Sequence, residues 1–270
     1  MKLCFSTLAC PAWDLRRIVD VAAENGIEGV DFRGIGEEID ITKLPAFNAE
    51  MDATLAFMRD RRVAMPCLNT SVTLVSPAPE RWAAMLEECH RYAQLASRTG
   101  TRFIRCFGGA VPVGMTRDEA RSMAQRHLRQ LAKICRPNGC QIVLETHDAW
   151  STSDEVLELV HEFDPADAGV LWDVEHTHRG GERATDTAEK LRRFVRHVHV
   201  KDSVRIDNKN SPRLLGEGEL PLADFVAALR GIGYDGYLCL ETEKRWHAEG
   251  PEPEQSIPQF ATYMRKLLAA

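Results

Sequence analysis

Eight segments with the pattern of buried β-strands alternate along the chain with eight segments of helical periodicity. The strand segments are short apolar runs at 1–6, 29–33, 63–69, 102–107, 141–145, 168–173, 197–200 and 237–241. The helical segments repeat apolar residues every three or four positions, over 14–25, 48–62, 81–99, 116–136, 153–163, 184–193, 222–231 and 257–268. Such alternation indicates a parallel sheet whose strands are joined by crossover helices.

Eight repeats favour a particular α/β fold, the (β/α)8 or TIM barrel. The 270 residues suit one such barrel, and no change in composition marks a linker, so we expect a single domain over 1–270. The alternative, an open doubly wound sheet, calls for a glycine-rich turn after an early strand. Residues 6–13 (STLACPAW) contain no glycine, and this favours the barrel.

Composition narrows the classes of partner and the compartment. The net charge of −6 argues against nucleic acid as the main partner, because phosphate backbones call for basic surfaces. No run approaches the roughly 18 apolar residues of a membrane span, and the first residues do not have the pattern of a signal peptide. The 8 cysteines form no C-x-x-C pair and lie mostly in apolar runs. We therefore expect buried, reduced thiols, a cytoplasmic location and no membrane partner.

The last four predicted strands each carry a residue that can bind a metal ion. These residues are Glu145, Asp173, His199 and Glu241, at or near the carboxyl end of each strand. In a (β/α)8 barrel the active site lies where strands end and strand-to-helix loops begin. Neighbouring strands are about 4.8 Å apart, so these side chains can converge on one ion. Three carboxylates and one imidazole predict one divalent cation, with Mn²⁺ preferred and Co²⁺, Mg²⁺ or Zn²⁺ possible.

The seventh strand places His197, His199 and Lys201 on one face, because side chains alternate along a strand. His197 lies one layer deeper than His199, and we interpret it as a core histidine. His147 lies two residues beyond Glu145 and is a candidate substrate contact, as is Lys201. Residues 216–219 (GEGE) lack the lysine and hydroxyl of a phosphate-binding loop and predict a turn.

The motifs LETH (144–147), LWDVEHT (171–177), HVHVKD (197–202), GEGELP (216–221) and GYDGYLCLE (233–241) resemble those of one family. It is the xylose isomerase-like barrels, the sugar phosphate isomerase/epimerase group, and the resemblance covers the whole length. It implies one divalent metal on the four residues named above, with His176 and Arg205 as substrate contacts. Ketose epimerases of the group carry a further glutamate where this chain has Ser151.

The resemblance implies a metal-dependent sugar isomerase or epimerase. A ketose or keto-polyol would react through a metal-stabilised enediolate, with Glu145 and Glu241 as acid and base. The alternative is a dehydratase of a cyclic keto-polyol of the inosose type, and a less favoured one is a non-catalytic sugar-binding barrel. An apurinic-site endonuclease is disfavoured, since its extra metals require more histidines in the first half. Trp13 and Trp246 are expected to line the pocket, and a homo-oligomer is possible.

Overall fold

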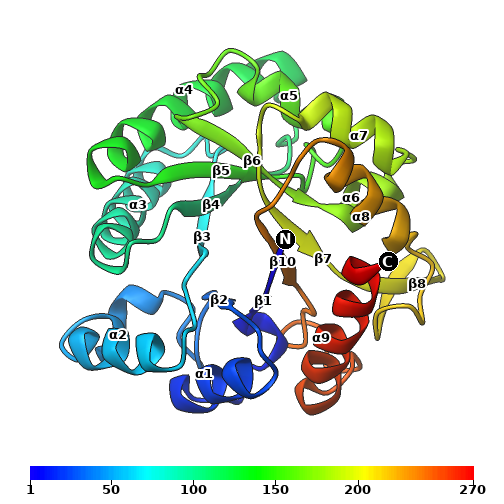
Figure 1. The fold of residues 1–270 in the computed structure, drawn as a ribbon. Coiled ribbons are helices and arrows are strands. Elements are labelled where there is room, and N and C mark those ends of the chain that lie inside the picture. Colours follow the sequence, from blue (N-terminus) through cyan, green and yellow to red (C-terminus); the bar gives the residue numbers. More distant parts are fainter. The chain divides into compact units, whose positions relative to one another are not determined.

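The computed structural model describes residues 1–270 and contains all eight predicted strands. They are β1 (Lys2–Ser6), β2 (Gly29–Asp31), β3 (Cys67–Thr73), β4 (Phe103–Phe107), β5 (Gln141–Glu145), β6 (Ala168–Asp173), β7 (Val195–Val200) and β10 (Tyr237–Leu240). The helices are α1 (Leu15–Glu24), α2 (Met51–Asp60), α3 (Pro79–Thr99), α4 (Arg117–Cys135), α5 (Ser153–Val160), α6 (Val174–Arg179), α7 (Ala184–Leu191), α8 (Leu222–Gly231) and α9 (Pro253–Ala269). Strands and helices thus alternate as the sequence predicts (Figure 1).

The chain groups into two compact units. The terminal unit consists of Met1–Pro66 with Val198–Ala270, and the central unit is Cys67–His197. The boundary falls within β7, whose first three residues belong to the central unit and whose last three belong to the terminal unit. The single domain expected over 1–270 stays a prediction.

The terminal unit has parallel strands in the order β2-β1-β10-β7. Its register places Cys4 opposite Cys239, and Cys239 in turn opposite His199. The first and last strands of the chain are therefore direct neighbours, as Figure 1 shows for β1 and β10. This pairing places residues from the beginning and the end of the chain next to each other on neighbouring strands.

The central unit has the strand order β7-β6-β5-β4-β3, again parallel. Helices α4 and α5 begin with capping boxes, in which Thr116 pairs with Glu119 and Thr152 with Glu155. Each threonine hydroxyl accepts a hydrogen bond from a backbone N–H that has no partner within the helix. The caps set where the loops after β4 and β5 end, and the loop after β5 carries the candidate residue His147.

The third strand starts later than predicted. The sequence pattern suggested 63–69, but β3 begins at Cys67, directly after Pro66. Proline has no N–H to donate to a strand ladder, and the residues before it do not join the sheet as a strand. Ala64 forms only an isolated bridge with Gly29, and the strand continues instead to Thr73.

Besides single 3₁₀ turns, two elements have no counterpart among those predicted from the sequence. One is an antiparallel hairpin of β8 (Asp202–Ile206) and β9 (Lys209–Arg213), turned by Asp207 and Asn208 at φ values of 48° and 61°. Aspartate and asparagine tolerate this left-handed conformation better than most residues, which makes them suited to tight hairpin turns. The other is the short helix α6, which begins directly after the last residue of β6.

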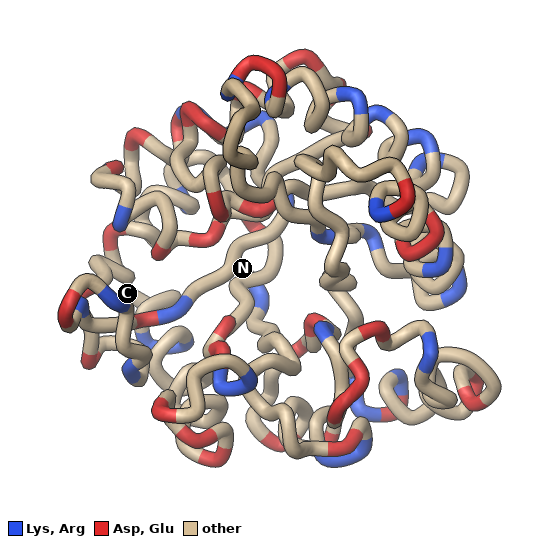
Figure 2. Tube along the Cα trace, turned by 180° about the vertical axis from the view of Figure 1, so that it is seen from behind, with Lys and Arg blue, Asp and Glu red and all other residues tan.

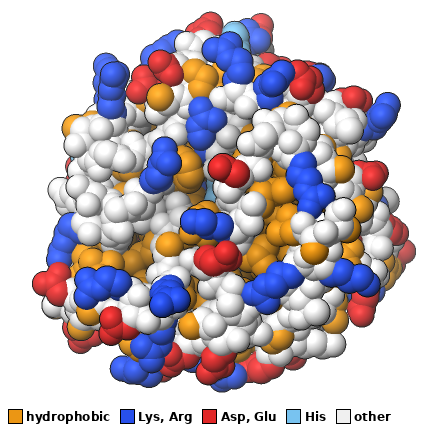
Figure 3. Space-filling view, viewed as in Figure 1, with side chains coloured by type: hydrophobic (Ala, Val, Ile, Leu, Met, Phe, Trp, Pro, Cys, Tyr) orange, Lys and Arg blue, Asp and Glu red, His pale blue; other side chains and the backbone are white.

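The interior is apolar and contains all eight cysteines as free, buried thiols. Lysine, arginine, aspartate and glutamate are interspersed along the helices in Figure 2. On the face drawn in Figure 3, side chains of both charges are likewise mixed. None of the helices is long and apolar enough to cross a membrane.

Candidate active site

In the central unit, β4, β5 and β6 end at Phe107, Glu145 and Asp173. Glu145 is 1% exposed and Asp173 is fully buried. A ligand oxygen of each lies within 4.8 Å of one on the other. Two carboxylates this close repel each other unless a cation lies between or beside them. Their arrangement therefore suits a bound cation.

Arg105 on β4 supplies one such cation. Its Nε atom lies 3.2 Å from Glu145 Oε2, and both side chains are 1% exposed. The guanidinium also donates from Nη1 to the carbonyl of Thr70 and stacks on the Phe107 ring at 3.9 Å. These contacts hold the arginine, and through it the glutamate, in one orientation.

Asp173 has two structural roles at once. Its Oδ1 atom accepts hydrogen bonds from the backbone N–H groups of Glu175 and His176, which caps the start of α6. Its Oδ2 atom lies 3.9 Å from Nε2 of His176. Because the cap fixes the carboxylate by one oxygen, the direction of the second oxygen is also fixed.

Three rings gather beside these carboxylates. The His147 ring lies 4.6 Å from that of His176, edge to face, and 4.9 Å from the Phe107 ring. Nδ1 of His147 is 3.0 Å from Asp148 Oδ1, and this hydrogen bond lowers the pKa of the Asp148 carboxyl. The structure thus brings together His147 and His176, both predicted substrate contacts.

In the terminal unit, His199 lies between two carboxylates. Its Nδ1 atom is 3.0 Å from Glu241 Oε1, and its Nε2 atom is 3.6 Å from Asp31 Oδ2. His199 and Asp31 are fully buried. A carboxylate on one ring nitrogen favours a proton there and leaves the other nitrogen as a donor to a metal ion. This geometry suits metal binding through Nδ1, on the side where Glu241 lies.

Lys201 is the cationic partner of Glu241. Its Nζ atom lies 2.8 Å from Glu241 Oε2 and 3.8 Å from Glu243 Oε2. Lys201 is 8% exposed and Glu241 3% exposed. The ion pair keeps the ammonium at the carboxyl end of β7, where the sequence analysis expected a substrate contact.

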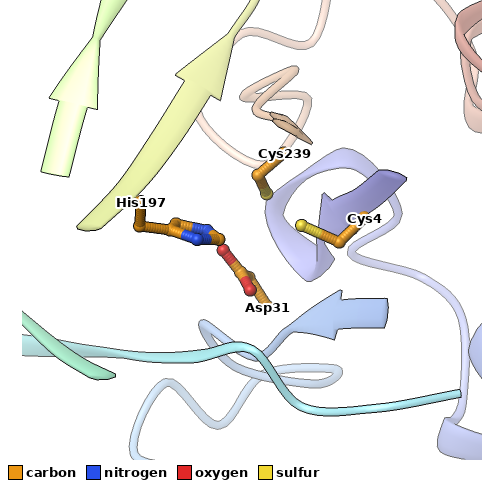
Figure 4. A group of neighbouring side chains, drawn as sticks. All are labelled: Cys4, Asp31, His197 and Cys239. Carbon is orange, nitrogen blue, oxygen red and sulfur yellow. The ribbon is translucent and has the colours of Figure 1, made fainter. Parts of the chain in front are cut away.

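Two thiols lie close to Asp31. Cys4 and Cys239 are neighbours on β1 and β10, and Figure 4 draws their side chains with that of Asp31. Burial and the nearby Cys4 and Asp31 raise the pKa of the Cys239 thiol. This thiol is therefore protonated at neutral pH, and it adds no negative charge beside Asp31.

The remaining predicted substrate contacts lie in the terminal unit, outside this buried group. Trp13 is 4% exposed and stacks with Arg17 at 4.4 Å. Trp246 is 55% exposed. Arg205 is exposed on β8, and its backbone N–H donates to Glu219 Oε2 at 3.3 Å. The sequence-based roles of these three residues stay predictions.

Two buried residues of the candidate site, Arg105 and Asp31, were not predicted from the sequence. Asp31 is the last residue of β2. It therefore has the same position at a strand end that led to the prediction of Glu145 and Asp173. Arg105 lies in an apolar strand, FIRCF, where an isolated arginine is unusual. Both residues matter through partners far away in sequence, which the pattern of a single strand does not reveal.

The donor groups of each unit are of types that bind divalent cations. The central unit offers two buried carboxylates, and the terminal unit offers a buried imidazole and a buried carboxylate. Burying charged groups without compensation is costly, and a bound cation would offset that cost. Oxygen donors with one imidazole match the preferences of Mn²⁺, Co²⁺, Mg²⁺ and Zn²⁺.

Comparison with known proteins identifies the class. Among solved structures, the probable 3-DHS dehydratase AsbF of Bacillus anthracis superimposes with a TM-score of 0.83 at 20% identity, over 98% of this chain and 99% of that one. The IolI protein, solved with a zinc atom, has a TM-score of 0.81 at 17% identity, over 100% and 97%. These likenesses show the fold, and the predicted (β/α)8 barrel is confirmed.

A family model described as the xylose isomerase-like TIM barrel matches residues 19–267. The chain therefore belongs to this family, as its motifs predict.

Several curated relatives are enzymes by name. The 3-dehydroshikimate dehydratase of Bacillus anthracis is 23% identical over 68% of this chain and 65% of its own. The inosose dehydratase of Geobacillus thermodenitrificans is 28% identical over 43% and 45%. The D-psicose 3-epimerase of Enterocloster bolteae is 26% identical over 45% and 40%. Each match spans less than two thirds of the relative's length.

Proposed function

We propose that this chain is a divalent-metal-dependent enzyme that exchanges the proton on the carbon next to the carbonyl of a keto-polyol. One observation carries the proposal: two buried glutamates, Glu145 and Glu241, each face a buried cation. Arg105 lies 3.2 Å from Glu145, and Lys201 lies 2.8 Å from Glu241. Buried carboxylates of this kind can take up and return a proton, as general acid–base chemistry on a carbon acid requires.

In this proposal Glu145, Asp173, His199 and Glu241 hold one ion, with Mn²⁺ preferred and Co²⁺, Mg²⁺ or Zn²⁺ as alternatives. A bound ion would supply Lewis acidity, which would make the C–H bond next to a substrate carbonyl more acidic. The zinc atom bound by the similar IolI protein supports a metal ion in this chain. Asp31 orients the His199 ring, and the cap of α6 orients Asp173.

The chain's own residues then move the proton. One carboxylate, Glu241 or Glu145, takes the proton from the carbon next to the carbonyl. The Lys201 ammonium beside Glu241 is placed to stabilise negative charge on substrate oxygens. His147 and His176 are placed to donate hydrogen bonds to hydroxyl groups from the central unit. We assign further substrate contacts to Arg205, Trp13 and Trp246.

The fate of the carbanion defines the reaction. Loss of a neighbouring hydroxyl gives dehydration, return of the proton to the opposite face gives epimerisation, and return to the adjacent carbon gives isomerisation. We favour dehydration of a cyclic keto-polyol. It is supported by the names of the 3-dehydroshikimate and inosose dehydratases, and by Ser151 where ketose epimerases carry a glutamate. Epimerisation or isomerisation of a ketose is the second candidate, supported by the D-psicose 3-epimerase relative.

A cytoplasmic location and a homo-oligomeric state stay predictions.

Incubation with inososes, 3-dehydroshikimate and ketohexoses in D₂O, with Mn²⁺ present, tests the proposal. We expect one substrate to lose water, or to gain deuterium next to its carbonyl, as measured by NMR and mass spectrometry. The variant Glu241→Gln should lower that rate by about 10²- to 10⁴-fold, since it removes one proton-transfer group.

Glu243→Gln is the matched control. Glu243 is also near Lys201, with its Oε2 atom 3.8 Å from Nζ, but its side chain is partly exposed. It should leave the rate within about threefold, in line with the small effects of most surface changes. A metal-loaded protein that neither exchanges protons nor dehydrates any of these compounds would contradict the proposal.

A further inference from the structure

A pocket in the central unit lies at the amino ends of strands β4 to β7. Its volume is about 530 Å³, and the charged side chains in its walls are three arginines and two aspartates. Arg102 directly precedes β4, Arg136 follows α4 and Arg196 is the second residue of β7. Asp164 and Asp167 lie in the loop before β6. The charged groups of the pocket therefore add up to a net positive charge.

This pocket is separate from the central-unit residues proposed for catalysis. Gln141, which lines it, is the first residue of β5, and Glu145 is the last. Because a strand rises about 3.3 Å per residue, the Cα atoms of these two residues are roughly 13 Å apart. The pocket thus lies at the opposite end of the strand from the proposed acid–base group, and it requires an explanation of its own.

The Arg196 side chain is held in one orientation. Its Nη2 atom donates to the Pro165 carbonyl at 2.7 Å, and its Nη1 atom donates to the Val195 carbonyl at 2.9 Å. Its aliphatic stem packs against Gly169, where a Cβ atom would lie 2.5 Å from Arg196 Cγ. The guanidinium is therefore fixed by neutral groups, and a ligand that binds it has little side-chain entropy to remove.

The two aspartates of the pocket have other partners. Oδ1 of Asp167 lies 3.7 Å from Nη1 of Arg136. Oδ1 of Asp164 accepts a hydrogen bond from the backbone N–H of Ala166 at 2.9 Å. Asp164 thus stabilises its own loop, and Asp167 balances the charge of Arg136.

Arg102 and Arg196 are the two cations of the pocket that form no ion pair. The guanidinium of Arg102 lies over the Phe103 ring at 5.7 Å, and that of Arg196 donates only to carbonyls. Burial and the like charge of Arg102 lower the pKa of the Arg196 guanidinium, in spite of the opposing effect of Asp164. Two guanidinium groups that repel each other in this way favour an anion that contacts both.

We propose that Arg102 and Arg196 bind a phosphate dianion in this pocket, as free phosphate or as the phosphate ester of a small molecule. A phosphate ester carries about 1.5 to 2 negative charges near neutral pH, which matches two guanidinium groups. The paired N–H donors of arginine also fit two phosphate oxygens at once. The volume lies within the roughly 300–1,000 Å³ of small-molecule pockets, and Phe103 adds an apolar wall. This binding does not depend on the activity proposed above.

Isothermal titration of the full chain with inorganic phosphate, glycerol 3-phosphate and glucose 6-phosphate tests the proposal at physiological ionic strength. We expect saturable binding of at least one of them with a Kd of about 1 mM or below. Esters that bind at least about tenfold more tightly than inorganic phosphate would identify an ester as the ligand, because only an ester also contacts the apolar wall. Equal affinities would identify free phosphate. Both results support the site, and they distinguish its two sources of phosphate.

Three variants locate the binding. Arg102→Gln should weaken it at least about tenfold, because the phosphate loses a charged hydrogen-bond donor. Asp164→Asn should strengthen it about two- to fivefold, since it removes a negative charge while an amide oxygen can still accept from Ala166. Arg126→Gln is the matched control, because Arg126 is exposed on α4 and does not line this pocket. Its Kd should stay within about twofold of the unaltered chain.

The absence of saturable binding for all three compounds would overturn the proposal. Equal affinities for Arg102→Gln and Arg126→Gln would also overturn it, since the phosphate would then bind elsewhere, for example at a metal ion. Arg196→Met should weaken binding as Arg102→Gln does. If Arg196→Met fails to fold, the variants at Arg102 and Asp164 still decide the question, because both of these side chains are exposed.

Discussion

Arg105 shows how a single side chain conditions the candidate site. It is a buried guanidinium whose main charged partner is Glu145, at 3.2 Å. Removing one member of a buried ion pair leaves the other uncompensated in a medium that solvates charge poorly. The residue thus stabilises the fold and the proposed acid–base group together.

We predict that Arg105→Met lowers the free energy of unfolding by about 3–5 kcal/mol in chelator-treated protein, as measured in urea. Arg129→Met is the control: Arg129 and Glu162 pair at 3.0 Å but are each 50% exposed, so its cost should stay below about 1 kcal/mol. If Glu145 binds metal, added Mn²⁺ should reduce the loss of unfolding free energy caused by Arg105→Met, because the ion compensates the charge of the same carboxylate. Equal costs for the two variants would rule out this role for Arg105.

Asp31 acts through His199 and is a positioning residue. Replacing it with asparagine keeps its size but removes the negative charge 3.6 Å from Nε2 of the imidazole. We predict that Asp31→Asn weakens Mn²⁺ binding by about 10- to 100-fold, as changes next to metal-binding histidines do. Isothermal titration measures this directly, with the exposed Asp60→Asn as control. Unchanged affinity would show that Asp31 does not orient the ligand.

At the scale of elements, Asp202 organises the segment between the hairpin and α8. Its carboxylate accepts hydrogen bonds from the backbone N–H groups of Ser203, Gly216, Gly218 and Leu220, at 2.8–3.1 Å. A Cβ on Gly218 would lie 2.0 Å from Asp202 Oδ1, so only glycine fits there. This contact explains the turn that the sequence predicts at 216–219.

We predict that Asp202→Ala costs about 3 kcal/mol of unfolding free energy, because several backbone donors lose a charged acceptor in a buried position. Asp235→Ala, at an exposed aspartate of the same unit, should cost less than about 0.5 kcal/mol. Chemical denaturation of both variants gives the comparison. A loss for Asp202→Ala as small as that of the control would show that water replaces the carboxylate in the turn.

At the scale of the whole molecule, a bound ion should stabilise the folded chain. A ligand present at 100 times its dissociation constant adds about 2.7 kcal/mol when it binds only the folded state. We therefore predict that EDTA lowers Tm by several degrees and that Mn²⁺ restores it. His199→Ala should abolish this shift, and metal analysis should show about one ion per chain only in the unaltered protein. A Tm independent of EDTA, with no metal in the protein, would contradict the site.

The sequence by itself determined the fold class and the four proposed metal ligands. Hydrophobic periodicity depends only on neighbouring residues, so the eight strands and their crossover helices could be predicted. There were two kinds of exception. The third strand, β3, begins later than predicted because of Pro66, and the polar hairpin and one short helix have little apolar periodicity. The four proposed ligands could be predicted because the active site of this fold lies at the carboxyl ends of the strands. They are Glu145, Asp173, His199 and Glu241.

Only the tertiary structure decided which groups neighbour these residues. Arg105 beside Glu145 and Asp31 beside His199 join residues about 40 and 168 positions apart. The reason is physical: charge and proton affinity depend on distance through space and on burial, and neither is encoded in the spacing of residues along one strand.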